Sequence, residues 1–447
     1  MNLKRLNFFY FIITVLLLQS CAIKKVSTEN AKELTLQEQI LKEFPSAKIK
    51  ALDIASDSHF TEKYEVYISQ PLSHENPKEG TLEQRIIVSH ADYNKPTLLE
   101  TSGYWIYDKD RELAKITKGN QIVVEYRYYG KSRPENPNWK YLHNAEAIED
   151  YHRIVTKFKN IYKGKWIASG VSKGGENTLI YRTKYPKDID VYVPYVAPLI
   201  HTTSDKRTDD HINTVGTEEC REKVKNFQRM LLEEPMRETL ISKSRDYVQN
   251  KNWTFNTMSL EEAFEYAVLE YSFSFWQWST DCESIPTSTN NVDEVFNHLM
   301  KVSGLYFYSD QGADAYLPSN YEHQTVYGYY KLDTSPVKDL LQYAHDPSFM
   351  NFIPEEIPVS YDPNYIKKVR NYIEKKGDRV IYIYGEFDTW YACAPNPKKN
   401  VDYLMMVLKG AHHGTRIKDF TKEDQDKIYA KLKEWLGDEV AIYPLYN

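Results

Sequence analysis

The sequence predicts an α/β protein whose mostly parallel sheet is interrupted by a helical insert. Apolar runs of strand length alternate with stretches of helical spacing before residue 200, and this alternation resumes after residue 360. That alternation is typical of a parallel sheet covered by helices on both faces. Between these two parts the pattern is mainly helical, so one sheet domain accommodates an inserted region of domain size.

The predicted strands share runs of β-branched and aromatic residues. They cover residues 64–68, 84–88, 96–100, 121–128, 164–168, 191–196, 379–384 and 403–408. The predicted helices repeat apolar residues every three or four positions. They cover residues 145–158, 177–181, 227–240, 260–275, 292–302, 365–375 and 422–436. Three of these helices follow one another with no strand between them, and they form the predicted insert.

The N-terminus has the pattern of a targeting segment. Lys4 and Arg5 precede an apolar run that ends at Leu18, and Ser20 and Cys21 follow it. This pattern is typical of a secretory signal, and the run is shorter than the about 20 apolar residues of a membrane span. The position of Cys21 resembles the lipid-modified cysteine of bacterial lipoproteins. An ordinary signal peptide with an incidental cysteine, or an uncleaved anchor, is the alternative.

A lipid on Cys21 would hold the chain at a membrane while the folded body stays in water. We therefore expect an exported bacterial lipoprotein that faces the periplasm or the cell surface. The net charge is −6 and no lysine-rich tract occurs, so nucleic acid is not an expected partner.

The cysteines predict one disulfide. Three cysteines follow Cys21 in the chain, and two of them, Cys220 and Cys282, lie in the predicted insert. An exported protein meets an oxidising compartment, so we pair these two and leave Cys393 as a free thiol. No Cys-x-x-Cys pair occurs, and we expect no metal site.

A glycine-rich segment, Gly170-Val171-Ser172-Lys173-Gly174-Gly175, lies between a predicted strand and a predicted helix. Gly-x-Ser-x-Gly in this setting is typical of a nucleophile elbow, a tight turn that exposes the serine hydroxyl at the edge of the sheet. Only small residues fit beside the serine in such a turn. Ser172 is therefore the predicted nucleophile, and an ordinary structural turn is the alternative.

Two later strands end in an acid and in a pair of histidines. Asp388 follows the second-to-last predicted strand, and His412 and His413 follow the last one. Because parallel strands end at the same edge of a sheet, the order serine, aspartate, histidine matches that of α/β-hydrolases. The residues alone leave both histidines open, and Asp402 and Asp92 are weaker rivals to Asp388.

The oxyanion hole is predicted from two backbone N–H groups. One belongs to Lys173, directly after the nucleophile, and the other to Tyr104, in the loop after an earlier strand. Gly103 permits close approach of that loop, although an ordinary glycine turn is the alternative. Serine, imidazole and these donors suffice for acyl transfer, so no cofactor is expected.

Longer stretches of the chain resemble a known family. Residues 124–134, Val-Glu-Tyr-Arg-Tyr-Tyr-Gly-Lys-Ser-Arg-Pro, resemble a segment of proline-directed serine peptidases such as lysosomal Pro-X carboxypeptidase and its dipeptidyl peptidase relative. The chain is more similar still to the bacterial prolyl tri/tetrapeptidyl aminopeptidase family. The other matching stretches are residues 164–175, 193–198, 275–277, 385–388 and 413–417.

The resemblance implies an α/β-hydrolase fold with an inserted helical cap domain over the active site. It also implies a serine exopeptidase that releases tri- or tetrapeptides from free peptide N-termini, often after proline. It selects His413, because the family's histidine precedes Gly-x-Arg-Ile. The predicted segments are a signal peptide (1–20), a tether (21–45), the first part of the hydrolase domain (46–199), the cap (200–360) and the second part of the hydrolase domain (361–447).

A proline at the cleaved position needs a shallow apolar slot with aromatic walls. Trp276 in the cap and Trp390 beside the acid are candidates for these walls, together with Phe273, Phe275 and Trp278. For each residue taken singly, plain packing in the core of the cap is the alternative.

An exopeptidase also needs a carboxylate to hold the substrate ammonium. Glu125, Glu270 and Glu283 are candidates, and Glu125 could instead pair with Arg127. The sequence does not choose among them.

Two other functions stay open at this point. A carboxylesterase or lipase uses the same elbow, because a fold does not determine a substrate. A non-catalytic surface lipoprotein that binds peptides is the further alternative, which the presence of all three catalytic residue types disfavours. Peptides are the expected partners of the serine exopeptidase and of the non-catalytic lipoprotein.

Overall fold

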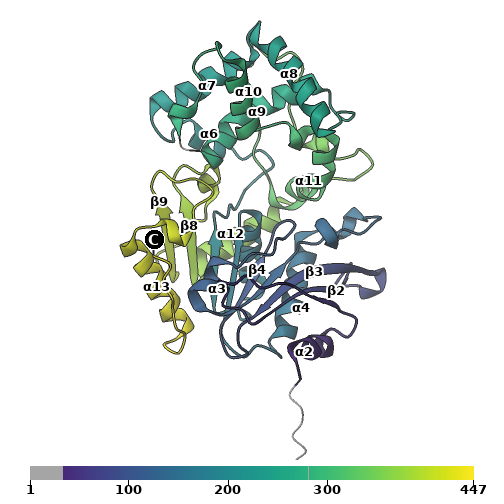
Figure 1. Cartoon of the computed structure of the whole chain (residues 1–447), viewed down its shortest axis with the longest axis vertical. Coiled ribbons are helices and arrows are strands. Elements are labelled where there is room, and N and C mark those ends of the chain that lie inside the picture. The colour runs from purple at the N-terminus through teal and green to yellow at the C-terminus, as the bar shows by residue number, and fades with distance from the viewer. Residues whose placement is uncertain (1–33, 280, 447) are drawn as a thin grey trace, which may run out of the picture. The chain divides into compact units, whose positions relative to one another are not determined.

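The computed structural model describes residues 34–279 and 281–446. The predicted signal peptide lies outside the described residues, and so does Cys21. A compact unit from Ile40 to Asn447 contains a nine-stranded sheet and all the helices from α3 onward (Figure 1). Within the described ranges, none of the helices is both long and apolar enough to cross a membrane.

The strands run in the order β1-β2-β3-β5-β4-β6-β7-β8-β9 across the sheet. The pairs from β1 to β5 are antiparallel, and every pair from β5 to β9 is parallel. The strands are β1 (Lys48–Ala51), β2 (Glu62–Pro71), β3 (Thr81–His90), β4 (Thr97–Thr101), β5 (Asn120–Val124), β6 (Trp166–Val171), β7 (Val191–Tyr195), β8 (Val380–Gly385) and β9 (Tyr403–Leu408). The parallel strands therefore end at one edge, which is where ligands bind in such sheets.

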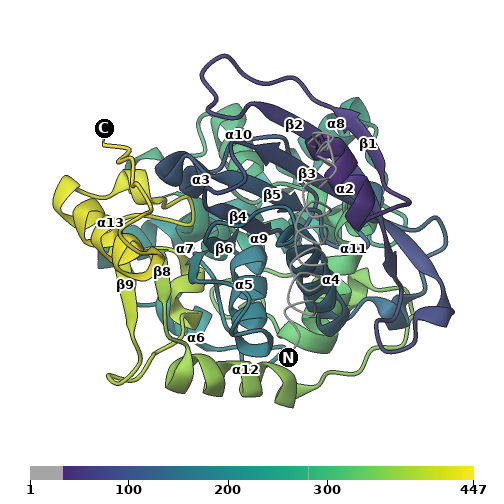
Figure 2. The same ribbon diagram turned by 90° about the horizontal axis from the view of Figure 1, so that it is seen from below.

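Helices cover both faces of the sheet (Figure 2). One face packs against α3 (Glu112–Thr117) and α13 (Lys422–Leu436), which share an apolar core with the strands. The other face carries α4 (Asn144–Phe158), α5 (Lys173–Lys184) and α12 (Pro363–Lys376). The sheet is thus buried on both sides, as its continuous apolar strands require.

Two local differences from the predicted elements stand out. The predicted strand 121–128 ends at Val124, because the chain turns away there and Tyr128 adopts a φ of 69°. The segment 21–45, expected as a tether, contains a helix, α2 (Leu36–Glu43). The spacing of Leu36 and Ile40 along one helical face explains this helix.

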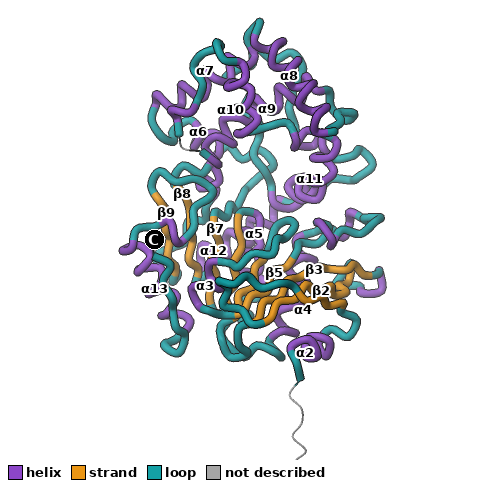
Figure 3. Tube along the Cα trace, viewed as in Figure 1, coloured by secondary structure: helices purple, strands orange, loops and turns teal. Residues whose placement is uncertain are grey.

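The chain between β7 and α12 forms a cap, and the residues that the structure describes there include no strand (Figure 3). Its helices are α6 (Arg207–Ile212), α7 (Glu218–Leu232), α8 (Met236–Lys251), α9 (Leu260–Trp278), α10 (Val292–Val302) and α11 (Asp310–Glu322). The cap has an apolar core of its own, centred on α9. A disulfide joins Cys220 of α7 to Cys282, with Cα atoms 5.5 Å apart, whereas Cys393 is a buried free thiol.

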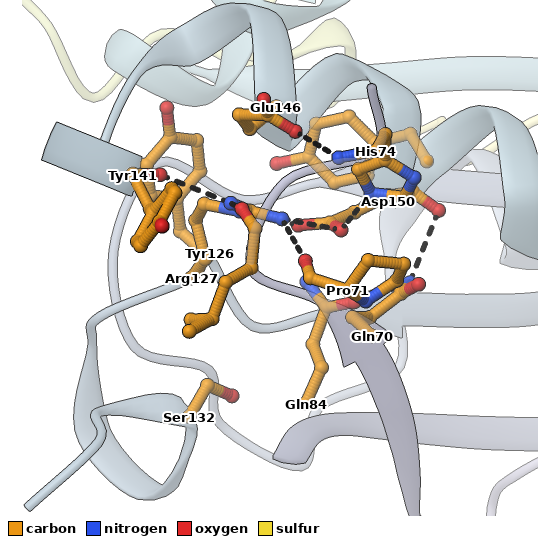
Figure 4. Close-up of polar contacts among 12 residues, drawn as sticks. Gln70, Pro71, His74, Gln84, Tyr126, Arg127, Ser132, Tyr141, Glu146 and Asp150 are labelled. Atoms are coloured by element: carbon orange, nitrogen blue, oxygen red, sulfur yellow. Dashed lines mark hydrogen bonds and ion pairs between the residues drawn. The ribbon is translucent and has the colours of Figure 1, made fainter. Parts of the chain in front are cut away.

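A buried ion pair anchors the chain just after β5 (Figure 4). The Arg127 guanidinium donates to both carboxylate oxygens of Asp150 on α4, at 2.7 and 2.8 Å. Its other N–H groups donate to the carbonyls of Pro71, Leu72 and Tyr141. Every donor of the guanidinium therefore has an acceptor, which offsets the cost of burying the charge. Arg127 thus pairs with Asp150, and not with Glu125 as the sequence had allowed.

Candidate active site

Ser172 occupies the turn between β6 and α5. Its φ of 57° and ψ of −124° are unusual for a residue with a side chain, and such backbone strain is concentrated at functional sites. The Ser172 N–H donates to the Tyr195 carbonyl at the end of β7 (2.9 Å), and the Ser172 carbonyl accepts from Glu176 N (2.9 Å). Hydrogen bonds on both sides thus hold the serine in the strained conformation.

Neighbouring backbone excludes side chains at the two glycines of the elbow. A Cβ on Gly170 would lie 2.3 Å from the Gly174 carbonyl carbon, and a Cβ on Gly174 would lie 2.5 Å from the Thr101 carbonyl oxygen. These contacts involve rigid backbone, so neither neighbour can give way. The turn that exposes Ser172 therefore requires glycine at both positions.

The acid and the base are in contact at the same edge of the sheet. Asp388 follows β8 and is fully buried, and its Oδ2 lies 2.7 Å from His413 Nδ1. Its Oδ1 accepts from Trp390 N (3.1 Å). A proton on Nδ1 satisfies this carboxylate and leaves Nε2 as the acceptor. No hydrogen bond joins Ser172 Oγ to His413 in the described part of the chain, and such catalytic contacts often tighten only when substrate binds.

The cap helix α9 contacts both of these loops. His413 N donates to the Gln277 carbonyl (2.9 Å), and Thr389 Oγ1 donates to the Phe273 carbonyl (3.1 Å). The Trp278 ring packs edge-on against the His413 imidazole, with centroids 5.0 Å apart. Contacts with α9 therefore help to hold the two loops that carry Asp388 and His413.

The residues that carry the two predicted oxyanion donors line the same cavity as the serine. Lys173 is the first residue of α5, where a backbone N–H has no acceptor within the helix. A Cβ on Gly103 would lie 2.8 Å from Gly174 N, so the loop that carries Tyr104 passes in direct contact with the elbow. Lys173, Tyr104 and Ser172 all line one cavity.

This cavity has a volume of about 300 Å³ and lies between the strand edge and the cap. Its hydrolase side includes Tyr104, Ser172, Lys173, Glu176, Pro198 and Trp390. Its cap side includes Glu270, Phe273, Gln277, Trp278, Phe307, Tyr308, Tyr329 and Tyr330. The walls are therefore mainly aromatic, with two carboxyl groups among them.

A family model described as PS-10 peptidase S37 matches residues 48–443, which is most of the chain. The chain belongs to the S37 peptidase family. The family resemblance inferred from the sequence is confirmed, as is the α/β-hydrolase fold with an inserted helical region.

Several known proteins are similar to this S37 peptidase. The prolyl tri/tetrapeptidyl aminopeptidase of Streptomyces mobaraensis is 30% identical over 394 residues, which cover 84% of this chain and 82% of that protein. A putative serine protease of Caenorhabditis elegans is 26% identical over 199 residues, 39% of each chain. Among solved structures, the proline iminopeptidase of Mycobacterium smegmatis is 12% identical with a TM-score of 0.39, and the match covers 83% of this chain and 97% of that one.

Two residues predicted to bind substrate do not reach the cavity. Glu125 is buried elsewhere in the S37 peptidase, where its carboxylate accepts from Ser132 N and Oγ (3.0 and 2.8 Å) and lies 3.4 Å from Arg85. Trp276 is fully buried in the core of the cap, with its ring 5.5 Å from that of Phe387. The structure therefore places neither side chain at the cavity, because each is buried among contacts of its own.

Trp390 lines the cavity as expected, and so does Glu270. The Glu270 carboxyl accepts from Ser274 Oγ (2.7 Å) and from Tyr330 Oη (2.6 Å). Burial raises the pKa of Glu270 to about 7. The third acidic candidate, Glu283, is exposed and pairs with Lys223 outside the cavity.

The rival residues have other partners in the S37 peptidase. His412 Nδ1 accepts from Gly414 N (2.9 Å) within its own turn. Asp402 accepts from Lys431 and Trp435 on α13, and Asp92 accepts from Asn94. Among these rivals and the favoured residues, only Asp388 and His413 are in contact with each other.

Proposed function

We propose that this S37 peptidase releases tri- or tetrapeptides from the free N-termini of peptides, cleaving after proline, with Ser172, Asp388 and His413 as its catalytic triad. One observation carries the proposal: a nucleophile, an aromatic wall and a titratable carboxyl group line the same cavity. The similarity to the prolyl tri/tetrapeptidyl aminopeptidase of Streptomyces mobaraensis, over most of both chains, supports the same activity.

The proposed reaction proceeds through an acyl-enzyme. His413 Nε2 takes the proton of Ser172 Oγ as this oxygen attacks the carbonyl carbon of the proline residue. The N–H groups of Lys173 and Tyr104 bind the negative oxygen of the tetrahedral intermediate. His413 then passes its proton to the departing amine, the C–N bond breaks, and water repeats the sequence to release the short peptide. Asp388 holds the imidazole in the required tautomer throughout.

The aromatic wall suits a proline ring. The Trp390 ring lies 5.0 Å from that of Phe273 and 5.6 Å from that of Tyr330, measured between centroids. The three rings come from the acid loop and from two separate parts of the cap, and all three line the cavity. Rigid rings offer a preformed apolar surface at little entropic cost, which favours the compact side chain of proline.

Glu270 is the group that we assign to the substrate ammonium. Glu176 also lines the cavity, but it lies one helical turn from Ser172. An extended tripeptide spans roughly 10 Å, so its amine lies farther from the serine than one turn allows. Burial also raises the pKa of Glu176 well above the usual range, which disfavours the anion that would attract a cation. Glu270 stands on the opposite wall and ionises near neutral pH.

This assignment predicts a pH-dependent affinity for peptides. In the Ser172→Ala background, a Pro-containing peptide with a free N-terminus should bind about tenfold more weakly for each pH unit below 7, because a carboxyl with a raised pKa is lost as an anion below that value. Changing Glu270 to Gln should weaken binding at pH 7.5 about 10- to 100-fold. Calorimetry of binding is the measurement, because turnover also requires an unprotonated imidazole.

Two controls accompany this measurement. The same peptide with an acetylated N-terminus should bind weakly at every pH and should not respond to the Glu270 substitution. Glu283→Gln, a substitution of an exposed acid in the same cap, should leave affinity unchanged. If the Glu270→Gln variant binds the free peptide as tightly as the unchanged chain does, and still prefers it to the acetylated peptide, Glu270 does not hold the substrate ammonium.

The activity itself is tested with a peptide library in which each sequence is present with a free and with an acetylated N-terminus. Mass spectrometry should find tri- and tetrapeptide products that end in proline from the free set only. Cleavage of the acetylated set at internal positions would contradict the exopeptidase proposal. Hydrolysis of acyl esters with no cleavage of any Pro-containing peptide would favour the carboxylesterase alternative.

We also propose that the protein is exported and anchored by a lipid on Cys21, in view of the basic, apolar and small residues that precede this cysteine. Cells grown with a labelled fatty acid should yield a labelled protein, and Cys21→Ser should abolish the label. A secreted, unlabelled protein in the unchanged sequence would contradict this proposal.

A further inference from the structure

The side chain of Lys173 is buried, although the residue also lines the cavity. Its Nζ lies 2.8 Å from Glu322 Oε2 at the end of α11 and 3.0 Å from the Gly103 carbonyl oxygen. It also lies 3.6 Å from the centroid of the Tyr126 ring. The ammonium thus donates to a carbonyl and lies beside a carboxylate and a π face, which together compensate its charge.

The Gly103 carbonyl belongs to the peptide group that carries the Tyr104 N–H. Because a trans peptide is planar and holds C=O and N–H in opposite directions, the contact with Nζ determines where the N–H points. The hydrogen bond also withdraws electron density from this peptide group, which makes its N–H a stronger donor.

The rest of this loop is held just as firmly. The Ser102 carbonyl accepts from Tyr151 Oη (2.7 Å) and from Asn177 Nδ2 (3.2 Å). The Tyr104 carbonyl accepts from Tyr126 N (3.0 Å). All three successive carbonyls therefore have donors, and the Gly103 carbonyl is the one whose donor carries a positive charge.

We propose that the Lys173 side chain is a positioning residue for the oxyanion hole: it orients and polarises the Gly103–Tyr104 peptide, while the Lys173 backbone supplies the other donor. One residue thus serves both halves of the hole. This inference rests on the proposed acyl-transfer activity. Glu322 has a separate part, because it compensates the ammonium and accepts from Tyr126 Oη (2.6 Å) without touching the Gly103 carbonyl.

A purely structural ion pair is the competing explanation, and double substitution separates the two. Lys173→Met with Glu322→Gln removes the ammonium without leaving an unpaired buried carboxylate. Glu322→Gln alone keeps the ammonium on the Gly103 carbonyl and is the comparison variant, and it should unfold at a lower temperature because the ammonium loses its carboxylate. Circular dichroism and thermal unfolding of both variants establish that they fold.

We expect the double variant to lose about 10- to 100-fold in kcat with KM nearly unchanged. It loses the support of one oxyanion donor, and removing a whole donor lowers kcat by about 10²–10³. Its affinity for a peptide aldehyde, which forms a tetrahedral adduct with the serine, should fall by a similar factor. Glu322→Gln alone should retain kcat within about threefold. If the methionine variant does not fold, Lys173→Gln with Glu322→Gln removes the same charge, and a loss of at least about tenfold is expected there.

A folded double variant with unchanged kcat and unchanged aldehyde affinity would overturn the inference. So would an equal loss in Glu322→Gln alone, because that result would assign the effect to the ion pair. The assays are repeated with an activated ester, whose hydrolysis also passes through an oxyanion. An enzyme that cleaves the ester but no peptide would refute the proposed specificity and still test the role of Lys173.

Discussion

Changing Ser172 to Ala is expected to lower kcat for peptide release by about six orders of magnitude, as for other serines of this kind. The hydroxyl is the only nucleophile proposed for this site, and the oxyanion donors alone retain a small residual rate. The Ser172 side chain makes no capping hydrogen bond to α5, so the variant should unfold at the same temperature as the unchanged protein. Turnover of a fluorogenic Pro-containing peptide, followed over hours, measures the loss.

Ser288→Ala, in a loop of the cap, is the control and should keep full activity and full labelling by a fluorophosphonate. Ser172→Ala should take up no label. Peptide release by Ser172→Ala at more than about a thousandth of the original rate would mean that another group attacks the substrate, and the proposed triad would be abandoned.

Changing Asp388 to Asn should lower kcat by about four orders of magnitude. The asparagine amide can donate toward His413 Nδ1, and this contact favours the tautomer that carries its proton on Nε2. The imidazole then has no free electron pair with which to accept the serine proton. Measurement of kcat with the same fluorogenic peptide gives the loss, and KM should change little because Asp388 does not line the cavity.

Asp402→Asn is the matched control, since Asp402 also lies between β8 and β9 but interacts with α13. Its kcat should stay within about twofold of the unchanged value. The acid assignment fails if Asp388→Asn folds normally and still turns over peptide at a tenth of the original rate or faster.

Local sequence patterns predict the bounds of those helices and strands whose ends are marked by capping residues, glycine or proline. The predicted helix 422–436 coincides with α13, because Thr421 caps its first turn and Gly437 follows its last residue. The predicted helix 227–240 is instead parts of two helices, α7 and α8, which meet at Pro235. The aromatic residues after Val124 look like strand residues, but they belong to a turn. Composition does not show where a ladder of hydrogen bonds stops.

In the candidate site, too, local patterns predict some residues and miss others. Ser172 and Asp388 each follow a strand, so a short motif and the rule for strand ends are enough to select them. The same rule leaves His412 and His413 as candidates for the base, and the family resemblance selects His413. Lys173 and Glu322 are distant in the chain, and no periodicity marks them as partners. Glu125 and Trp276 were selected for their chemical type alone. Their burial depends on neighbours such as Ser132 and Phe387, which only the folded chain brings next to them.

Residues of the cap form much of the wall around Ser172, and this has a consequence for the enzyme's surroundings. A site covered in this way suits the free terminus of a peptide fragment, whereas a folded protein presents only its surface and closed loops. Such an enzyme poses little danger to intact proteins in its own compartment. Under the proposed function, its substrates are the peptide fragments that an endopeptidase has already released.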